Sequence, residues 1–325
     1  AAAPRLVEAL ARIAGDHGYD DPVDRRLATA LTDAVAAAWQ MGWQPADLHR
    51  AAERVRGSAH ARLTARAIGH DAQRHAGTTI PPRWRLQLDA IGASGVSERW
   101  AVPWPAPSNA SAGPATPSVA RVQAVAVAVE ALALVRSLPR MPKLGPLPGE
   151  VAAPARGRSR GVGHPVGADP RVLHKVTALL AKAESTDFPD EAEALTAKAQ
   201  ELMTRHAIDQ AHLDAPQGDR PAVGGRRIGI DDPYAGARFL LLAAVADANR
   251  CRAVWTKFWG FATVFGDEGD LDAVELLFTS LLVQATRAMV AQPRPRGSGS
   301  TRSFRQSFLV AFARRIGVRL HEAAE

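Results

Sequence analysis

A chain of 325 residues can hold two or three domains, and because only 6% of its residues are aromatic, their cores have to be built mainly from Ala, Leu and Val. Such a composition favours helices over sheets. The single cysteine, Cys251, excludes an internal disulfide, and no apolar run predicts a membrane span of roughly 20 residues. The first residues are charged where a secretory signal is apolar, so we expect a cytoplasmic protein without a membrane partner.

The net charge of +7 is distributed unevenly. Residues 1–95 carry +2, residues 96–170 carry +4, residues 171–215 carry −3 and residues 216–325 carry +4. Most basic residues are arginines, which suit bidentate contacts with phosphate. An Arg- and Ala-rich composition also follows from genome composition, so charge alone does not identify a nucleic-acid partner.

Residues 1–95 predict a helical domain. One helix is expected from Pro22 to about Met41, because apolar residues recur at helical spacing and Gly42 follows. A second helix is expected from Pro45 toward Ala67, with a break near Gly57. The stretch "TTIPPRW" (78–84) is expected to end the region.

Residues 96–168 predict a linker that contains one helix, at about 118–138. Val122, Val125 and Val129 share a helical face, although the alternation of Val and Ala leaves a strand possible. Residues 139–170 contain seven prolines and six glycines, so disorder is expected there.

The remaining two segments predict a helical hairpin and an α+β unit. In residues 169–215, one helix begins after Asp169 and a second at about Pro189, separated by the turn "ESTDFPDE". In residues 216–325, a helix (234–249) precedes a β-hairpin of "CRAVW" and "FATVF", and two further helices follow. The expected fold class is therefore mainly α, with a helical N-terminal region, a central helical hairpin and a C-terminal α+β unit with one short β-hairpin.

The hairpin resembles a known family. Its pattern is Lys175-Val-x-x-Leu179-Leu-x-x-Ala183-x-Ser185-Thr, followed by Glu191-Ala-x-Ala194, Lys198-Ala and Leu202-Met203. Over about residues 170–212 it is similar to the bacterial and phage family called domain of unknown function 2786. The stretch "GWQPADL" (42–48) resembles the N-terminal region of actinobacterial members. Residues 228–323 resemble a companion domain, domain of unknown function 7168, with Ala311 where that family has Gly. The family has no established activity, so the resemblance assigns no functional residue.

No enzyme motif emerges from the sequence. A phosphate-binding P-loop and the H-E-x-x-H zinc motif are both missing, and one cysteine excludes a thiolate zinc site. Asp267, Glu268, Asp270 and Asp272 could hold Mg²⁺, but acids at a helix N-terminus also complement the helix dipole, which is the simpler interpretation. We therefore expect no catalytic residue, no metal site and no cofactor.

The Arg-rich C-terminal helix is the strongest functional signal. Between Leu276 and Leu320 the chain has eight arginines and no acid. Phe304, Phe308, Phe312 and Ile316 are expected to form the inner face, which Arg305 would share. A buried arginine needs a partner, and we expect Glu275 to pair with Arg305.

The other basic residues of this part of the chain could contact phosphate or be solvated. The candidate nucleic-acid-binding residues are Arg302, Arg314, Arg319, Arg294, Arg296, Lys175 and Lys182. The basic linker stretch "ARGRSRG" (155–161) is a weaker candidate of the same kind.

The sequence thus favours a non-enzymatic nucleic-acid-binding accessory protein that contacts DNA or RNA. Two alternatives stay open. In the first, the protein is an interaction or oligomerisation module, whose acidic hairpin docks on the basic unit of the same or another chain. In the second, it is a metal-dependent nuclease.

Overall fold

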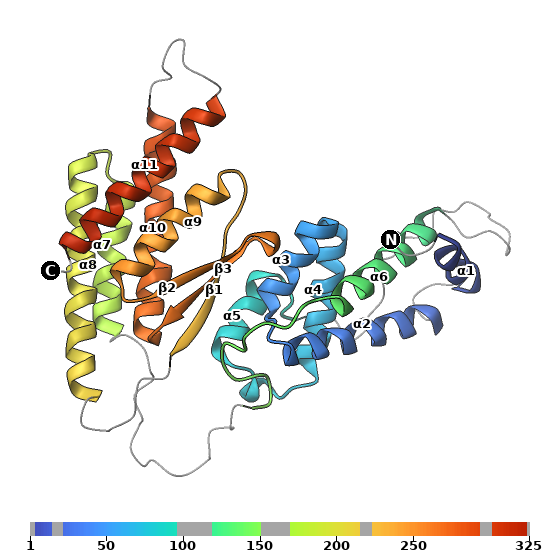
Figure 1. The fold of residues 1–325 in the computed structure, drawn as a ribbon. Coiled ribbons are helices and arrows are strands. Elements are labelled where there is room, and N and C mark those ends of the chain that lie inside the picture. Colours follow the sequence, from blue (N-terminus) through green and yellow to red (C-terminus); the bar gives the residue numbers. More distant parts are fainter. Residues whose placement is uncertain are drawn as a thin grey trace. The chain divides into compact units, whose positions relative to one another are not determined.

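The computed structural model describes residues 4–14, 22–95, 119–150, 170–214, 223–292 and 301–323. The fold is mainly α with one small antiparallel sheet, as predicted (Figure 1). The chain forms two compact units, unit 1 (residues 1–158) and unit 2 (residues 159–325). The four predicted segments are therefore grouped into two units.

Unit 1 is helical throughout its described part. Its elements are α1 (Pro4–Ala14), α2 (Pro22–Gln40), α3 (Pro45–Arg56), α4 (Ser58–Gln73), the 3₁₀ turn η1 (Gly77–Thr79), α5 (Pro82–Ala90) and α6 (Val119–Arg136). The predicted break at Gly57 is present, with φ at 92°, a conformation that favours glycine. Residues 78–84 do not end the region, because Pro82 begins α5.

Helix α6 is part of the core of unit 1, where the sequence predicted a helix within a linker. Its face of Val125, Ala128, Ala131 and Val135 is buried, and it packs against α1, α2 and α4. The Arg121 guanidinium also forms a buried ion pair with Asp24 of α2, at 2.7 Å. The alternation of Val and Ala left a strand possible in the sequence. In the structure these side chains belong to a helix and pack against the other helices of unit 1.

The segment that follows α6 is held against unit 1, although its prolines and glycines predicted disorder. The indole of Trp43 donates a hydrogen bond to the Pro139 carbonyl at 2.9 Å, and the amide of Met141 donates to the Met41 carbonyl at 2.8 Å. Further along, the Gly149 amide donates to the Thr79 carbonyl at 3.0 Å, so residues 139–150 pack on the helices of unit 1. Residues 151–169, which were also predicted to be disordered, lie outside the described residues.

Unit 2 contains the predicted hairpin and the predicted α+β unit. The hairpin is α7 (Pro170–Ser185) and α8 (Pro189–Asp214). The rest is β1 (Gly224–Gly229), α9 (Ala235–Ala248), β2 (Arg252–Thr256), the 3₁₀ turn η3 (Lys257–Trp259), β3 (Phe261–Gly266), α10 (Glu268–Ala291) and α11 (Thr301–Glu322).

The sheet has one strand more than predicted. Strands β2 and β3 form the expected hairpin, with Trp255 opposite Ala262, and β1 pairs with the other edge of β3. The sequence of β1, "GGRRIG", shows no alternation of apolar and polar residues, because one of its helix-facing positions is Arg226. That charged position hid the strand from pattern analysis.

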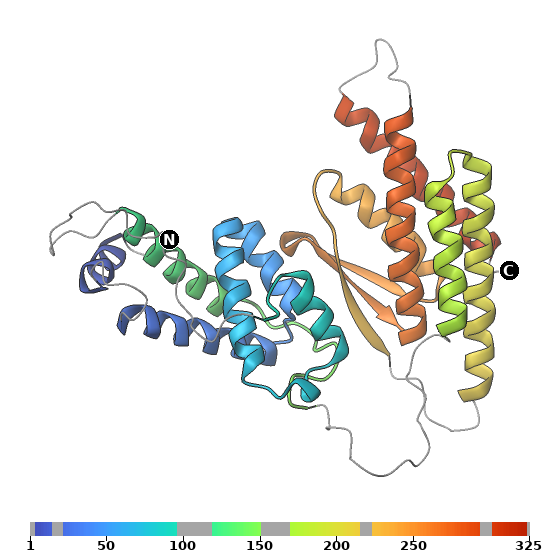
Figure 2. The same cartoon turned by 180° about the vertical axis from the view of Figure 1, so that it is seen from behind.

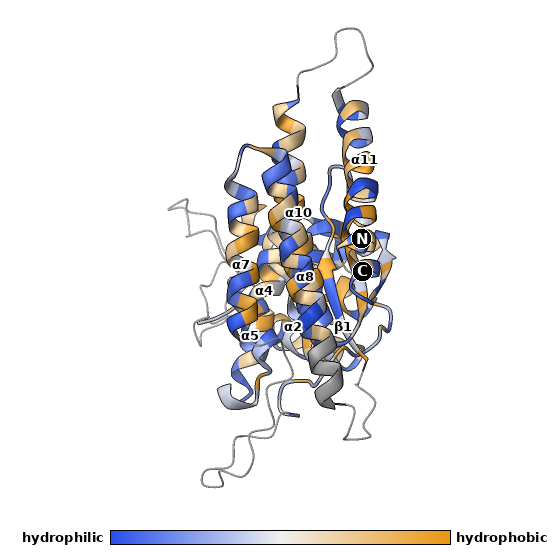
Figure 3. Ribbon diagram, turned by 90° about the vertical axis from the view of Figure 1, so that its left-hand side faces the viewer, coloured by the Kyte–Doolittle hydropathy of each residue, from blue (hydrophilic) through white to orange (hydrophobic). Residues whose placement is uncertain are grey.

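Helix α10 lies between the sheet and the helical hairpin, as Figures 1 and 2 both show. Val176 and Leu180 of α7 and Ala199 of α8 share one apolar core with residues of α9, α10, α11 and the sheet. In Figure 3 hydrophobic and hydrophilic residues alternate along α7, α8 and α11, as expected for helices with one buried side. The hairpin is thus an integral part of unit 2.

Helix α10 is also the one described helix that is long and apolar enough, by length and composition, to cross a membrane. The sequence analysis overlooked this feature. In this structure α10 packs on strands and on other helices, as the core helix of a soluble domain does, and a core helix passes the same test.

The close approach of residues 139–142 to Gly42 can be tested by substitution. A Cβ at Gly42 would lie 2.2 Å from the Met141 carbonyl oxygen, and its φ of 89° is unfavourable for alanine. We expect Gly42→Ala to lower the free energy of unfolding by at least about 1–2 kcal/mol, from the backbone strain alone. Gly77→Ala is the control, since a Cβ there meets open space, and it should be neutral or slightly stabilising in urea unfolding.

Substitutions in the buried Arg121–Asp24 ion pair can test whether α6 packs in the core of unit 1. Removing one partner leaves a buried charge, so Arg121→Met should destabilise the protein by about 3–5 kcal/mol in denaturant unfolding. The double variant Asp24→Leu/Arg121→Met should recover most of that loss. Equal stability of the single variant and the parent would mean that α6 is not packed in unit 1.

Candidate functional site

The inner face of α11 is rotated from the predicted one. Its buried residues are Leu309, Ala313, Ile316 and Leu320, and the helix packs mainly against α9. Of the predicted inner residues, Ile316 is buried as expected, whereas Phe304, Phe308 and Phe312 are only half-buried. Phe308 and Phe312 still pack against the core, so the aromatic side chains mark the edge of the buried face rather than its centre.

Four of the five arginines of α11 divide into two groups. Arg315 and Arg319 both contact the carboxylate of Glu193 on α8, Arg315 with its Nε at 3.1 Å. Arg302 and Arg314 are exposed, and neither forms an ion pair with another described residue. Arg294 and Arg296 lie outside the described residues.

The predicted phosphate-binding residues of α11 do not share a face. At 100° per residue, Arg302 and Arg314 are separated by about 120° around the helix, and Arg314 and Arg319 by about 140°. Of the two lysines on the hairpin, Lys175 is exposed, whereas Lys182 pairs with Glu191 at 2.8 Å. A single surface through all of these residues is therefore not formed by unit 2.

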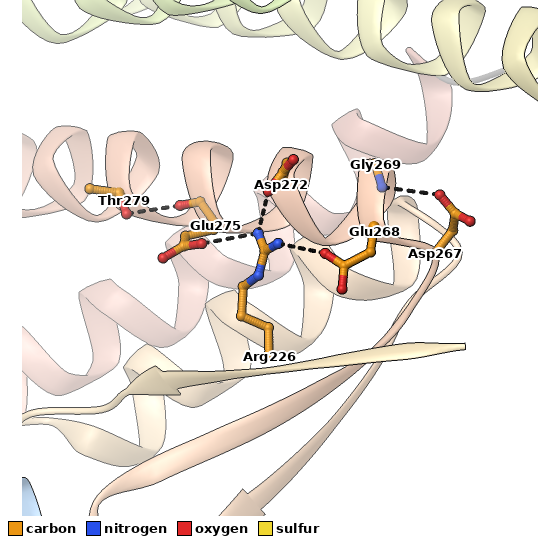
Figure 4. Close-up of polar contacts among 7 residues, drawn as sticks. All are labelled: Arg226, Asp267, Glu268, Gly269, Asp272, Glu275 and Thr279. Atoms are coloured by element: carbon orange, nitrogen blue, oxygen red, sulfur yellow. Dashed lines mark hydrogen bonds and ion pairs between the residues drawn. The ribbon is translucent and has the colours of Figure 1, made fainter. Parts of the chain in front are cut away.

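Glu275 binds Arg226 rather than the predicted Arg305. The Arg226 side chain, 3% exposed, extends from β1 to three carboxylates of α10 (Figure 4). The distances are 3.1 Å to Glu268, 2.7 Å to Asp272 and 3.0 Å to Glu275. These acids stand at positions i, i+4 and i+7 of the helix, so one guanidinium can reach all three.

The prediction for Arg305 was wrong because the helices meet elsewhere. Leu309, one turn after Arg305, packs with Ala285 and Met289. Glu275 lies ten residues before Ala285 on the same helix, which is about 15 Å along the axis. Arg305 is therefore far from the acid that the sequence suggested.

The acids after β3 all have structural partners. Asp267 caps α10 by accepting a hydrogen bond from the Gly269 amide at 3.0 Å, and Glu268 and Asp272 bind Arg226. Asp270 accepts a hydrogen bond from Arg250 Nε at 3.1 Å. Burial raises the pKa of Asp270, and the bond from Arg250 opposes that effect. Within the described residues no group of three potential metal ligands occurs.

Cys251 is not a candidate nucleophile. The thiol is buried, and desolvation raises its pKa to about 12, so it is protonated at neutral pH. The nucleophile in thiol chemistry is the thiolate, which this environment disfavours.

A groove between α8, α10 and α11 is a concave site of unit 2. It has a volume of about 630 Å³, and residues of the turn between α7 and α8 form part of its lining. Its lining is mainly apolar and includes Ala192 of α8, Ala288 of α10, and Phe312 and Ile316 of α11. Three arginines lie along it, Arg287, Arg315 and Arg319. We call this site the arginine groove.

Each arginine of the groove meets the hairpin. Arg287 donates to the main-chain carbonyl of Glu184 and lies 3.5 Å from the Asp187 carboxylate, while Arg315 and Arg319 meet Glu193. Arginines beside apolar surface can bind carboxylate or phosphate groups. The arrangement is therefore suited to binding an anion, and no nucleophile–base pair is evident among its lining residues.

Of the residues that line the groove, Arg319 is the one that sequence analysis named as a candidate binding residue. Arg287, Arg315 and Glu193 were missed because their proximity depends on how the hairpin packs against α10 and α11. The one available signal was the i, i+4 spacing of Arg315 and Arg319, which places two guanidiniums on one side of a helix.

The Arg226 cluster generates a test with a matched control. Arg226→Gln removes the charge that three carboxylates share, and we expect a loss of about 1.5–3 kcal/mol, the range for hydrogen bonds to charged groups. Solvent screens the acids, which are 35–50% exposed, so a larger loss is not expected. Arg305→Gln should stay within about 0.5 kcal/mol of the parent. Similar losses in urea unfolding for both variants would contradict this assignment.

The hairpin is the part of the chain that corresponds to a known family. Residues 171–210 match the family model described as a protein of unknown function (DUF2786), in agreement with the resemblance noted from its sequence. No curated protein and no solved structure gives a significant match. The resemblances of residues 42–48 and 228–323 stay predictions. The matched span covers α7 and most of α8, and α8 forms one wall of the arginine groove.

Proposed function

We propose that this protein is a non-enzymatic accessory protein that binds DNA or RNA through the phosphate backbone, without reading the base sequence. The observation that carries the proposal is the charge of α11. This helix contains five arginines and a single acid, Glu322, and it exposes Arg302 and Arg314 without an ion-pair partner among the described residues. Exposed guanidiniums of this kind are available for phosphate contacts.

The proposal differs from the sequence-based one in the residues it uses. Arg319 is already engaged by Glu193 and belongs to the arginine groove, and Lys182 is paired with Glu191. The contacts we propose are separate phosphate contacts made by Arg302 and Arg314, which lie about 120° apart around α11, with Lys175 as a further exposed cation on the hairpin. Arg294 and Arg296 stay candidates from the sequence alone, because they lie outside the described residues.

The two alternatives receive different support. The interaction-module hypothesis required the acidic hairpin to dock on the basic unit, and within this chain the hairpin packs on α10 and α11. For docking between two chains, the hairpin of one copy would have to pack on α10 and α11 of the other copy. The nuclease hypothesis is weakened because Asp267 and Asp270, the two acids that would have to chelate the metal, cap α10 and pair with Arg250, respectively.

The nucleic-acid proposal predicts a change in the salt dependence of binding. Arg302→Gln/Arg314→Gln should weaken binding to DNA or RNA and leave the thermal midpoint nearly unchanged, since both side chains are exposed. Each lost phosphate contact should flatten the slope of log K against log salt by about 0.9 for duplex DNA, or about 0.7 for single strands.

A matched control removes the same charge elsewhere in unit 2. Lys198→Gln/Arg205→Gln also removes two cations, but both of these residues pair with Glu201 on α8. This variant should keep the slope of the parent in fluorescence anisotropy titrations. If the Arg302/Arg314 variant behaves like the control, these arginines are a solvated edge and the proposal fails.

A further inference from the structure

The charges in the arginine groove are not balanced at its α11 wall. Arg315 and Arg319, one helical turn apart, both contact the same carboxylate, that of Glu193. At this wall two guanidiniums and one carboxylate leave one positive charge in excess, while the other two acids of the lining, Glu184 and Asp187, lie at the hairpin turn beside Arg287. The Glu193 side chain is only 20% exposed and Arg319 37%, whereas Arg315 is 66% exposed, so water screens the charge at Arg319 less than on an open surface.

The surface next to these charges is apolar. Ala192, Ala288, Phe312 and Ile316 line the groove beside them, and Phe312 is half-buried rather than enclosed in the core. Apolar walls with a few convergent charged groups are typical of small-molecule sites, and about 630 Å³ falls within the usual range of roughly 300–1,000 Å³. The arginine groove thus combines a cationic wall with an apolar wall.

We propose that the arginine groove binds a small amphipathic anion, a molecule with one carboxylate, sulfonate or phosphate group on an apolar body. The anionic group binds Arg315 and Arg319 and neutralises the excess charge. The apolar body lies on Phe312, Ile316, Ala192 and Ala288. This ligand is a free small molecule, and its site is distinct from the exposed arginines proposed to contact nucleic acid.

Glu193 sets the affinity of the proposed site. Its carboxylate competes with the ligand anion for the same two guanidiniums and repels it. Neutralising Glu193 should therefore strengthen binding, whereas removing either arginine should weaken it. If the three residues had only a structural role, all of these substitutions would loosen the hairpin. They would then not change ligand affinity in opposite directions.

The test uses the fluorescent probe anilinonaphthalene sulfonate, an aromatic body with one anionic group, on the full chain. Arg319→Gln should raise the dissociation constant of the probe about tenfold, as expected for the loss of a charge-assisted hydrogen bond. Glu193→Gln should lower it. Decanoate, which carries a carboxylate on an alkyl chain, should displace the probe from the parent protein.

Two further variants separate binding from folding. Ala288→Trp fills the groove without touching the charges and should abolish probe binding at an unchanged thermal midpoint. Arg314→Gln removes a cation of the same helix outside the groove and should bind the probe as the parent does. Equal probe affinity in the parent, Ala288→Trp and Arg319→Gln would overturn the proposal. Because Arg314→Gln impairs only the proposed nucleic-acid surface, the two proposals can fail separately.

Discussion

The architecture of unit 2 depends on the burial of α10. Leu271, Val274, Leu277 and Leu281 of this helix are fully buried, because the sheet covers one side of it and the hairpin another. Few aromatic residues are available, so close packing of aliphatic side chains has to supply most of the core. Without α7 and α8, the apolar side of α10 that they cover would face water.

Ion pairing between distant segments follows from that packing. Once the hairpin and β1 lie against α10 and α11, arginines enter partly dry surroundings, where an unpaired charge is costly. Arg226 of β1 meets acids of α10, and Arg315 and Arg319 of α11 meet Glu193 of α8. The stretch between Leu276 and Leu320 contains no acid, so its paired arginines bind carboxylates of the acidic hairpin. Part of the hairpin's charge of −3 is therefore used in ion pairs within unit 2.

The two proposed binding surfaces reflect how α11 is embedded. One side of the helix packs on α9, a second lines the arginine groove, and Arg314 lies on a third that is exposed. Sequence analysis grouped three arginines of α11, Arg302, Arg314 and Arg319, as one set of candidate phosphate-binding residues. Their separation around the helix instead gives them different surroundings, and so different chemical roles.

The sequence by itself determined the helices that begin at a proline or a cap and end near a glycine, the β2–β3 hairpin and the resemblance of the α7–α8 hairpin to DUF2786. These features depend on local spacing and on backbone preferences that a short stretch contains. Tertiary structure alone decided strand β1, the burial of α6, the partner of Glu275 and the arginine groove. Each of these arises from side chains far apart in the sequence, such as Arg226 and Glu275 or Glu193 and Arg319, whose proximity is set by packing rather than by any local pattern.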